Sequence, residues 1–168
     1  LVQTIRRLPG VREAEGRRSV TVRLQIGPDQ WRNLSLMAYP DYQAIRINQI
    51  WPVEGAWPPP RHEVLLERAA LSYLNLKIGD VLQVETSGGL RREMRVAGQV
   101  YDAARLSPIL QATVNGYISL DTMQWLGQPR TFSELRIIVA GNAPNRQSIT
   151  QVANAVRDKI ERGGRGVS

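Results

Sequence analysis

The residues best suited to acid–base chemistry are His62 and Glu63, which are neighbours in the sequence. His62 is the only histidine, and an imidazole beside a carboxylate is a common arrangement for proton transfer. Adjacent residues of a strand point to opposite faces, however, so these two side chains would not meet. Because His62 also follows a Pro-Pro-Pro-Arg run, it is more typical of a solvated loop than of a catalytic pair.

Other reactive groups are scarce. The chain has no cysteine, and it therefore offers neither a thiolate nucleophile nor thiolate ligands for a metal. Its serines lack the G-x-S-x-G elbow, and Gly88-Gly89 lacks the Lys-Ser/Thr of a phosphate-binding loop. A carboxylate pair such as Asp80 and Glu85 is explained more simply by a turn and a solvent-facing strand position. The sequence predicts a protein that is not an enzyme, with no catalytic residue, no cofactor and no metal ion.

Positive charge is the next chemical feature, since 22 lysines and arginines against 15 aspartates and glutamates give a net charge of +7. Such an excess suits nucleic acid, anionic lipid headgroups or an acidic partner. The basic residues occur as separate pairs, such as Arg17-Arg18 and Arg91-Arg92, and as a C-terminal cluster. They lack the interleaved aromatic residues of a surface that binds single strands. We therefore expect no nucleic-acid partner.

The strongest structural pattern lies in residues 63–101. Apolar residues alternate with polar ones in two consecutive segments, at Leu82 and Val84 and again at Met94 and Val96, which predicts two strands. Ser87-Gly88-Gly89 lies between them and predicts the tight turn of an antiparallel hairpin. Before the hairpin, apolar residues spaced for one helical face predict a short helix that ends near residue 79.

The same reasoning predicts the other elements. The predicted helices cover residues 1–8, 121–126 and 149–160, and the predicted strands form a hairpin over 18–38 and two further segments at 115–119 and 133–140. The last strand has apolar residues on both faces, which predicts burial on both sides. No run approaches the roughly 20 apolar residues needed to cross a bilayer.

Two segments contain candidate contact residues. Residues 51–60 carry four of the ten prolines with Trp51 and Trp57, and we expect this segment to be a crossing between two lobes, since proline excludes helix and interior strand. The two tryptophans are either exposed anchors for a peptide or partner, or a wedge between the lobes. Leu106, Ile109 and Leu110 lie in an unpatterned segment, residues 102–114, and either contact a partner or cap the small lobe.

Three motifs carry a family resemblance. The residues that carry it are Leu8-Pro9-Gly10-Val11, Gly55-Ala56-Trp57-Pro58, Val64-Leu65-Leu66, Ala70, Leu74, Leu76-Lys77-Ile78-Gly79-Asp80-Val81-Leu82, Arg92, Val96, Gly98 and Val100. In this order and spacing they resemble the extracytoplasmic, or periplasmic core, domain of MacB/FtsX-type ABC transporter permeases. The resemblance spans most of the chain, although each motif by itself is degenerate.

This resemblance implies an α+β fold. A porter-like α/β sandwich lobe would be formed by residues 1–50 and 130–168, with a small β-rich, Sabre-like lobe inserted at 51–129. It also implies a non-catalytic domain on the extracytoplasmic side of the cell membrane, which couples ATP-driven movement of transmembrane helices to export or to activation of a partner. ATP hydrolysis would belong to a separate ATPase domain or subunit, the transmembrane helices would flank this sequence, and the permease would form a homodimer or heterodimer.

A second function class remains open from the residues alone. The chain also fits a free-standing soluble module that binds a peptide or nucleic acid. Apolar segments of about 20 residues in the gene beyond each end would favour the permease over this module. A partner outside the membrane is compatible with either class.

Overall fold

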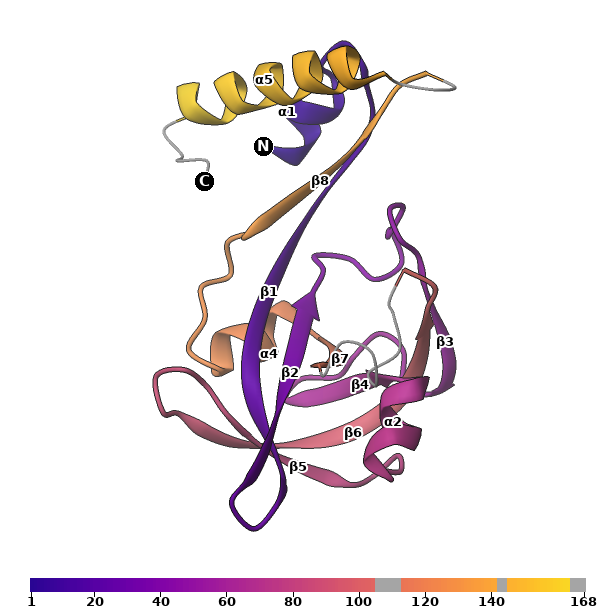
Figure 1. The fold of residues 1–168 in the computed structure, drawn as a ribbon, viewed down its shortest axis with the longest axis vertical. Helices are drawn as coiled ribbons and strands as arrows, with labels where there is room; N and C mark the ends of the chain where they lie inside the picture. The colour runs from indigo at the N-terminus through magenta and orange to yellow at the C-terminus, as the bar shows by residue number, and fades with distance from the viewer. Residues whose placement is uncertain (105–112, 142–144, 164–168) are drawn as a thin grey trace. The chain divides into compact units, whose positions relative to one another are not determined.

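Most of this protein consists of strands in which apolar and polar residues alternate. The computed structural model describes residues 1–104, 113–141 and 145–163, and within them it contains eight strands and four helices (Figure 1). In chain order the elements are α1 (Val2–Arg6), β1 (Val11–Gly27), β2 (Gln30–Ala38), β3 (Ile50–Gly55), β4 (Glu63–Glu67), α2 (Arg68–Leu74), β5 (Val81–Glu85), β6 (Arg91–Asp102), β7 (Thr113–Ile118), α4 (Leu120–Trp125), β8 (Glu134–Val139) and α5 (Arg146–Arg162). The predicted α+β class is confirmed.

The predicted hairpin over residues 82–100 is confirmed as β5 and β6. The two strands pair antiparallel, with Leu82 opposite Met94 and Glu85 opposite Arg91. Leu82 and Val96 are 3% and 0% exposed, so the face predicted to be apolar does point into the core. Gly89 adopts a φ of +79° in the turn, a conformation that costs glycine little.

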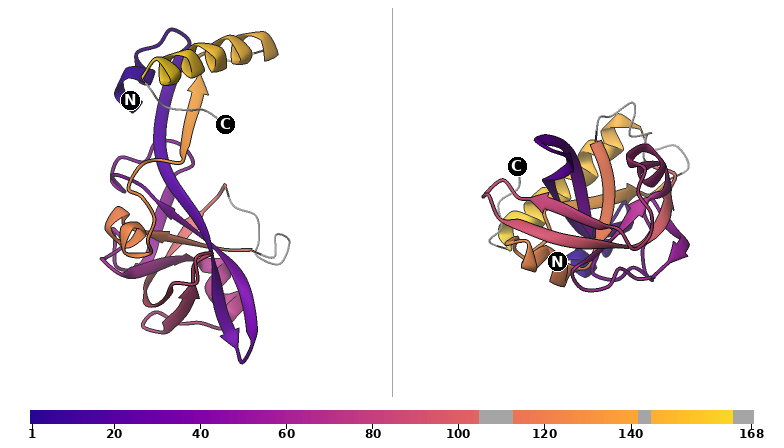
Figure 2. Two further views of the ribbon diagram at one scale, coloured as in Figure 1. Left: turned by 90° about the vertical axis from the view of Figure 1, so that its left-hand side faces the viewer. Right: turned by 90° about the horizontal axis from the view of Figure 1, so that it is seen from below.

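Six strands close into a ring, which periodicity alone does not reveal. Going round the ring, β1 pairs with β2, β2 with β7, β7 with β4, β4 with β6, β6 with β5, and β5 again with β1. Each of these strands sends residues such as Leu24, Leu36, Val64, Val84, Met94 and Val114 into one apolar cluster. Closure leaves the inner strands without free edges, and the strands curve round this shared core (Figure 2).

The segment predicted to be a crossing without sheet pairing is in part a strand. Residues 50–55 form β3, which pairs antiparallel with the end of β6 through partners such as Trp51 and Tyr101. The prediction of a crossing over the whole of residues 51–60 is therefore corrected. Pro52 is tolerated because β3 lies at an edge, where a missing backbone N–H breaks no ladder on the outer side. The register shifts between Pro52 and Glu54, which marks an irregularity at this point.

Helix α2 ends earlier than the sequence predicted. Its last residue is Leu74, and Asn75 closes it in the left-handed conformation with a φ of 52°. At its start, the carboxylate of Glu67 accepts a hydrogen bond from the Ala69 N–H. Gly79, which was predicted near the helix end, instead lies in the turn before β5. An asparagine can adopt the left-handed conformation, so the helix stops without a glycine.

Contacts divide the chain into two compact units. Unit 1 comprises Leu1–Gly16 and Leu135–Ser168, and unit 2 comprises Arg17–Glu134. The two lobes predicted from the sequence, residues 1–50 with 130–168 and residues 51–129, are a different division of the chain and stay a prediction. The difference arises because the hairpin of β1 and β2 pairs with β7 and β5, so its strands share the core of residues 51–129.

Unit 1 contains α1, α5, the first part of β1 and nearly all of β8. Its apolar cluster is small, with Ile5, Ala14, Val152 and Val156 buried. The prediction that β8 is buried on both faces is wrong, because every residue of this strand is only half-buried. Within the described part of the chain the strand pairs with β1 alone, at the end of the strand order, and is therefore an edge. No helix in residues 1–104, 113–141 or 145–163 is long and apolar enough to cross a membrane.

Candidate functional site

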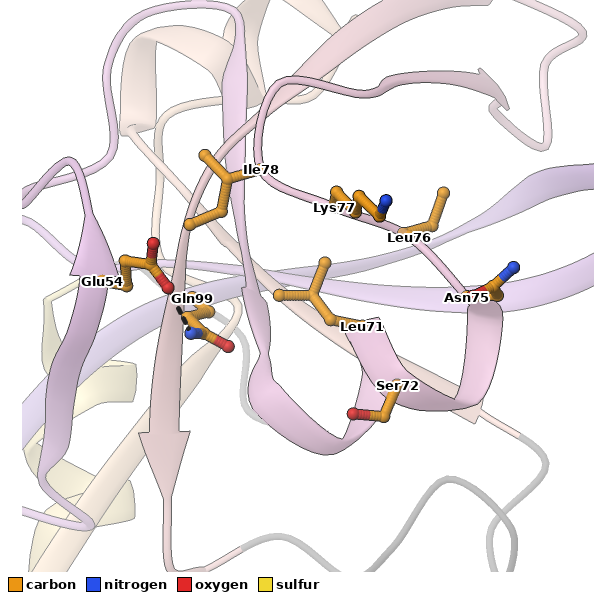
Figure 3. A pocket seen from close by; sticks show the side chains of 8 residues that line it. All are labelled: Glu54, Leu71, Ser72, Asn75, Leu76, Lys77, Ile78 and Gln99. Carbon is orange, nitrogen blue, oxygen red and sulfur yellow. Dashed lines mark hydrogen bonds between the residues drawn. The ribbon is translucent and has the colours of Figure 1, made fainter.

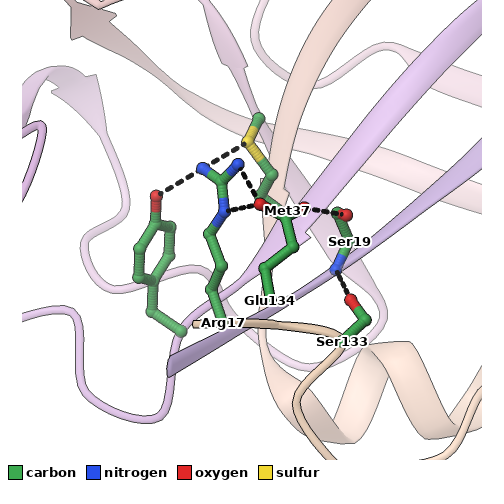
Figure 4. A network of polar contacts seen from close by, with 6 residues as sticks. Arg17, Ser19, Met37, Ser133 and Glu134 are labelled. Carbon is green, nitrogen blue, oxygen red and sulfur yellow. Dashed lines mark hydrogen bonds and ion pairs between the residues drawn. The ribbon is translucent and has the colours of Figure 1, made fainter. Parts of the chain in front are cut away.

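A network of polar side chains joins the first and last residues of unit 2. The Arg17 Nε and Nη2 atoms both donate to Glu134 Oε2, at 2.8 and 2.5 Å, and the Ser19 hydroxyl donates to Glu134 Oε1 (Figure 4). The Ser19 N–H donates to Ser133 Oγ at 3.1 Å, and the Ser133 N–H donates to the Arg17 carbonyl oxygen at 3.1 Å. This Arg17–Glu134 network therefore ties together the two chain segments that lead out of unit 2.

The charge of Arg17 is stabilised although the residue is only 5% exposed. Burial by itself lowers the pKa of the guanidinium, but the hydrogen bonds to Tyr39 and Glu134 outweigh it and raise the pKa above its ordinary value. Arg17 Nη1 also lies 3.5 Å from the Tyr39 hydroxyl and 3.7 Å from the Met37 sulfur. Removal of Glu134 would leave a buried cation without its carboxylate, which is strongly unfavourable.

Apart from one local hint, the sequence gives no signal for this network. Arg17 and Glu134 are 117 positions apart in the sequence. From the sequence alone, an arginine pair before a strand that is buried looks the same as one that is exposed to solvent. The only local hint is that Arg17 and Ser19 are two residues apart in a strand and so share one face.

The structure brings Trp51 and Trp57 together in unit 2. Both line one hollow of about 210 Å³, which Tyr42 also lines; we call it the aromatic hollow. Trp51 is 46% exposed and stacks on Tyr101 with ring centres 5.8 Å apart. Trp57 is half-buried and packs edge-on against Tyr42 at 5.3 Å. The other three candidate contact residues, Leu106, Ile109 and Leu110, lie outside the described residues.

His62 lies in an exposed turn, as predicted from the proline run before it. Its ring stacks on Trp125 with centres 4.4 Å apart, and its backbone adopts a φ of +62°. Glu63 instead faces Arg95, with 3.7 Å between their charged atoms. The two side chains therefore make separate contacts, as predicted, although His62 belongs to the turn before the strand and not to the strand itself.

A second, larger hollow of about 440 Å³ lies beside α2 (Figure 3). Leu71 and Ile78 supply apolar surface, whereas Glu54 and Lys77 supply one charge of each sign. The Gln99 amide donates to Glu54 Oε2 at 2.9 Å, so this carboxylate already has a partner within the wall. Among the described residues, no group of three or more His, Asp or Glu side chains is placed to hold a metal ion.

This arrangement of strands and helices is the fold of extracytoplasmic domains of ABC transporter permeases. The extracellular domain of the noncanonic ABC-type transporter YknZ from Gram-positive bacteria matches with a TM-score of 0.58 and 8% identity, over 95% of this chain and 82% of that one. The periplasmic region of MacB from Actinobacillus actinomycetemcomitans matches with a TM-score of 0.53 and 12% identity, over 99% and 82% of the two chains.

A domain of a permease protein from Porphyromonas gingivalis matches with a TM-score of 0.51 and 9% identity, over 92% of this chain and 65% of that one. No protein-family model matches the chain, and no curated protein matches it. The resemblance predicted from the three motifs is thus confirmed at the level of the fold, with very little identity in sequence.

Proposed function

We propose that this chain is the extracytoplasmic domain of an ABC transporter permease. In this function, transmembrane helices driven by an ATPase domain or subunit displace unit 1, and the displacement passes along the chain to unit 2 outside the membrane. The permease would act as a homodimer or heterodimer and would export a substrate or activate an extracytoplasmic partner. The domain itself would perform no catalysis.

The observation that carries this proposal is the Arg17–Glu134 network. Only two chain segments connect the units, at residues 16/17 and 134/135, and the network cross-links these segments where they enter unit 2. Two strands held side by side resist shear and bending better than two independent linkers, because each is fixed by the other's hydrogen bonds. Such a pair suits a connection that must transmit a displacement, and the fold shared with YknZ and MacB adds support.

The direct test measures distances between the units in the full-length permease during its ATP cycle. Ile149 in unit 1 and Val81 in unit 2 are 46% and 59% exposed, so both tolerate replacement by cysteine and attachment of a spin label. We expect the distance distribution between the labels to differ between the nucleotide-free state and the state trapped with ATP and vanadate. Identical distributions in the two states would overturn the proposal.

A variant of the network sharpens this test. Glu134→Ala should broaden the distribution in both states and reduce the difference between them, since the two segments lose their cross-link. Asp121→Ala is a matched control, because Asp121 also pairs with arginine, at 2.9 Å to Arg130, but neither partner is buried: the Arg130 and Asp121 side chains are 56% and 40% exposed. The control should retain the full ATP-dependent change. If the two variants gave the same distance distributions in both states, the network would have no role in the proposed mechanism.

A further inference from the structure

The aromatic hollow differs in chemistry from the rest of this cationic chain. Eight residues line it, and none carries a charge, although 22% of the chain is charged. Three of them, Tyr42, Trp51 and Trp57, are aromatic, whereas the whole chain is only 6% aromatic. Recognition here cannot use ion pairs and must rely on ring faces and neutral hydrogen bonds.

The rings are held in place by contacts behind the hollow. The buried Tyr42 hydroxyl lies 2.8 Å from the Ile118 carbonyl oxygen and 3.1 Å from that of Met37, and Trp57 packs on its ring. Burial raises the pKa of Tyr42 well above its ordinary value, so the hydroxyl stays protonated as a donor. On the other side, Trp51 stacks on Tyr101, which itself lies under the Arg68 guanidinium at 4.3 Å. The hollow is therefore preorganised, which reduces the entropy lost when a ligand binds.

The polar groups at the rim are suited to donate hydrogen bonds. Gln43 and Gln49 line the hollow and are exposed, and their side-chain amides make no hydrogen bond to the described part of the protein. The indole N–H groups of Trp51 and Trp57 are donors only. A ligand with free carbonyl oxygens would complement these donors.

The volume of the hollow and the backbone geometry of β3 restrict the choice of ligand further. A volume of 210 Å³ lies below the roughly 300 Å³ at which drug-sized pockets begin, so the hollow suits part of a chain rather than a cofactor. Addition of a β-strand to the outer edge of β3 is disfavoured, because Pro52 lacks an N–H and the register is irregular beside it. An extended strand is thus a poor occupant.

A polyproline II segment satisfies each of these conditions. Its backbone makes no internal hydrogen bonds, its proline residues present carbonyl oxygens without N–H groups, and its rings pack on aromatic faces. We propose that the aromatic hollow binds an uncharged, proline-rich segment of a partner protein in the polyproline II conformation. This inference does not depend on the transport function proposed above, because the same hollow would serve a free-standing module equally well.

The test titrates a blocked ten-residue proline peptide into the isotope-labelled chain and follows the indole N–H signals by NMR. The four tryptophans provide their own internal control: Trp51 and Trp57 line the hollow, whereas Trp31 and Trp125 lie elsewhere, against Arg23 and Arg92. We expect the signals of Trp51 and Trp57 to shift saturably and the other two to stay in place. Absence of shifts at millimolar peptide, or equal shifts of all four, would overturn the proposal.

Variants then separate binding from folding. Trp51→Ala removes a half-exposed ring and should weaken binding by about tenfold or more, as expected for a central aromatic contact. Trp31→Ala is the matched control and should bind as tightly as the unmodified chain. Since no lining residue is charged, affinity should hardly change when salt is raised from about 0.05 to 0.5 M. Steep salt dependence, or shifts caused by a neutral oligosaccharide such as chitohexaose in place of the peptide, would contradict the assignment.

Discussion

Unit 1 and unit 2 differ in how completely they bury their apolar residues. Among the residues that the structure describes, seventeen buried ones form the main cluster of unit 2, whereas four form the cluster of unit 1. The strands of unit 2 close into a ring, whereas β8 in unit 1 is an edge whose residues are all half-buried. Because stability follows buried apolar area, unit 2 should be the more stable of the two, and unit 1 should open at a lower free-energy cost.

This difference suits the proposed division of work between the units. A unit that takes up movement must be able to rearrange, and low-stability elements are the ones that usually do so. A unit that presents a binding surface must keep it in shape, as the ring core does for the aromatic hollow. All four tryptophans lie in unit 2, so tryptophan emission reports on this unit alone.

The largest effect is expected when a charge enters the ring core. Leu82→Asp or Val96→Asp removes a fully buried side chain, a loss of about 2 kcal/mol each, and adds the cost of burying an unpaired carboxylate. The sum is comparable to the about 5–15 kcal/mol that holds a typical domain folded, so unit 2 should unfold. Tryptophan emission would shift to the red in native buffer. Leu135→Asp, at a half-buried position of β8, is the comparison in unit 1 and should leave that emission unchanged.

The second effect concerns the Arg17–Glu134 network. Glu134→Ala should destabilise unit 2 by about 2–3 kcal/mol, less than loss of a fully buried pair costs, because a third of the Glu134 side chain is exposed. Urea unfolding followed by tryptophan emission measures the change. Asp121→Ala, which breaks exposed pairs, should cost less than about 1 kcal/mol. If both variants had equal midpoints, the network would have no special role in stability.

The third effect compares two glycines with the same backbone conformation. Gly10 and Gly89 have φ values of +82° and +79°, but a Cβ at Gly10 would lie 2.7 Å from Val152 Cγ2, whereas one at Gly89 would meet no atom within 4 Å. Both alanine variants bear the cost of a left-handed conformation, about 1 kcal/mol. Gly10→Ala adds a clash with α5, so hydrogen exchange in α5 should accelerate while the tryptophan signal keeps its midpoint. Gly89→Ala should leave α5 exchange unchanged.

Local patterns in the sequence predicted the elements better than their pairing. The hairpin of β5 and β6 was found because alternation and the Gly88-Gly89 turn are both encoded within twenty residues of chain. The start of β1 was missed, since residues 11–17 alternate weakly and their strand conformation depends on β8, far along the chain. The Arg17–Glu134 network was missed for the same reason. Trp51 and Trp57 were singled out as candidates by residue type alone, whereas the hollow that they share is also lined by Tyr42, which packs against Trp57 and lies in a segment that the sequence did not connect with them.

The smallest effect concerns the loss of stability at acidic pH. It tests the pairing of β5 with β1, which closes the ring of strands. Glu85 accepts hydrogen bonds from Arg23 and Arg91, which lower the pKa of Glu85 below its ordinary value of 4.5. A carboxylate whose pKa is lowered by folding stabilises the folded state above the ordinary value, and that contribution is lost as the pH falls through the folded pKa. Stability should therefore decline below about pH 4.5, and Glu85→Gln should flatten the decline.

Urea unfolding of unit 2 at pH values from about 7 to about 3 measures this slope. The matched control is Glu93→Gln, since Glu93 is an exposed carboxylate on β6 whose hydrogen bond comes from the neutral amide of Gln83, at 2.5 Å. The control should retain the slope of the unmodified chain. Because β5 and β1 share only two paired positions, Arg23 with Glu85 and Leu24 with Val84, a flattened slope in Glu85→Gln alone would locate the acid-sensitive contact at the closure of the ring. An unchanged slope would mean that the packing of Leu24 and Val84 closes the ring without help from the ion pair.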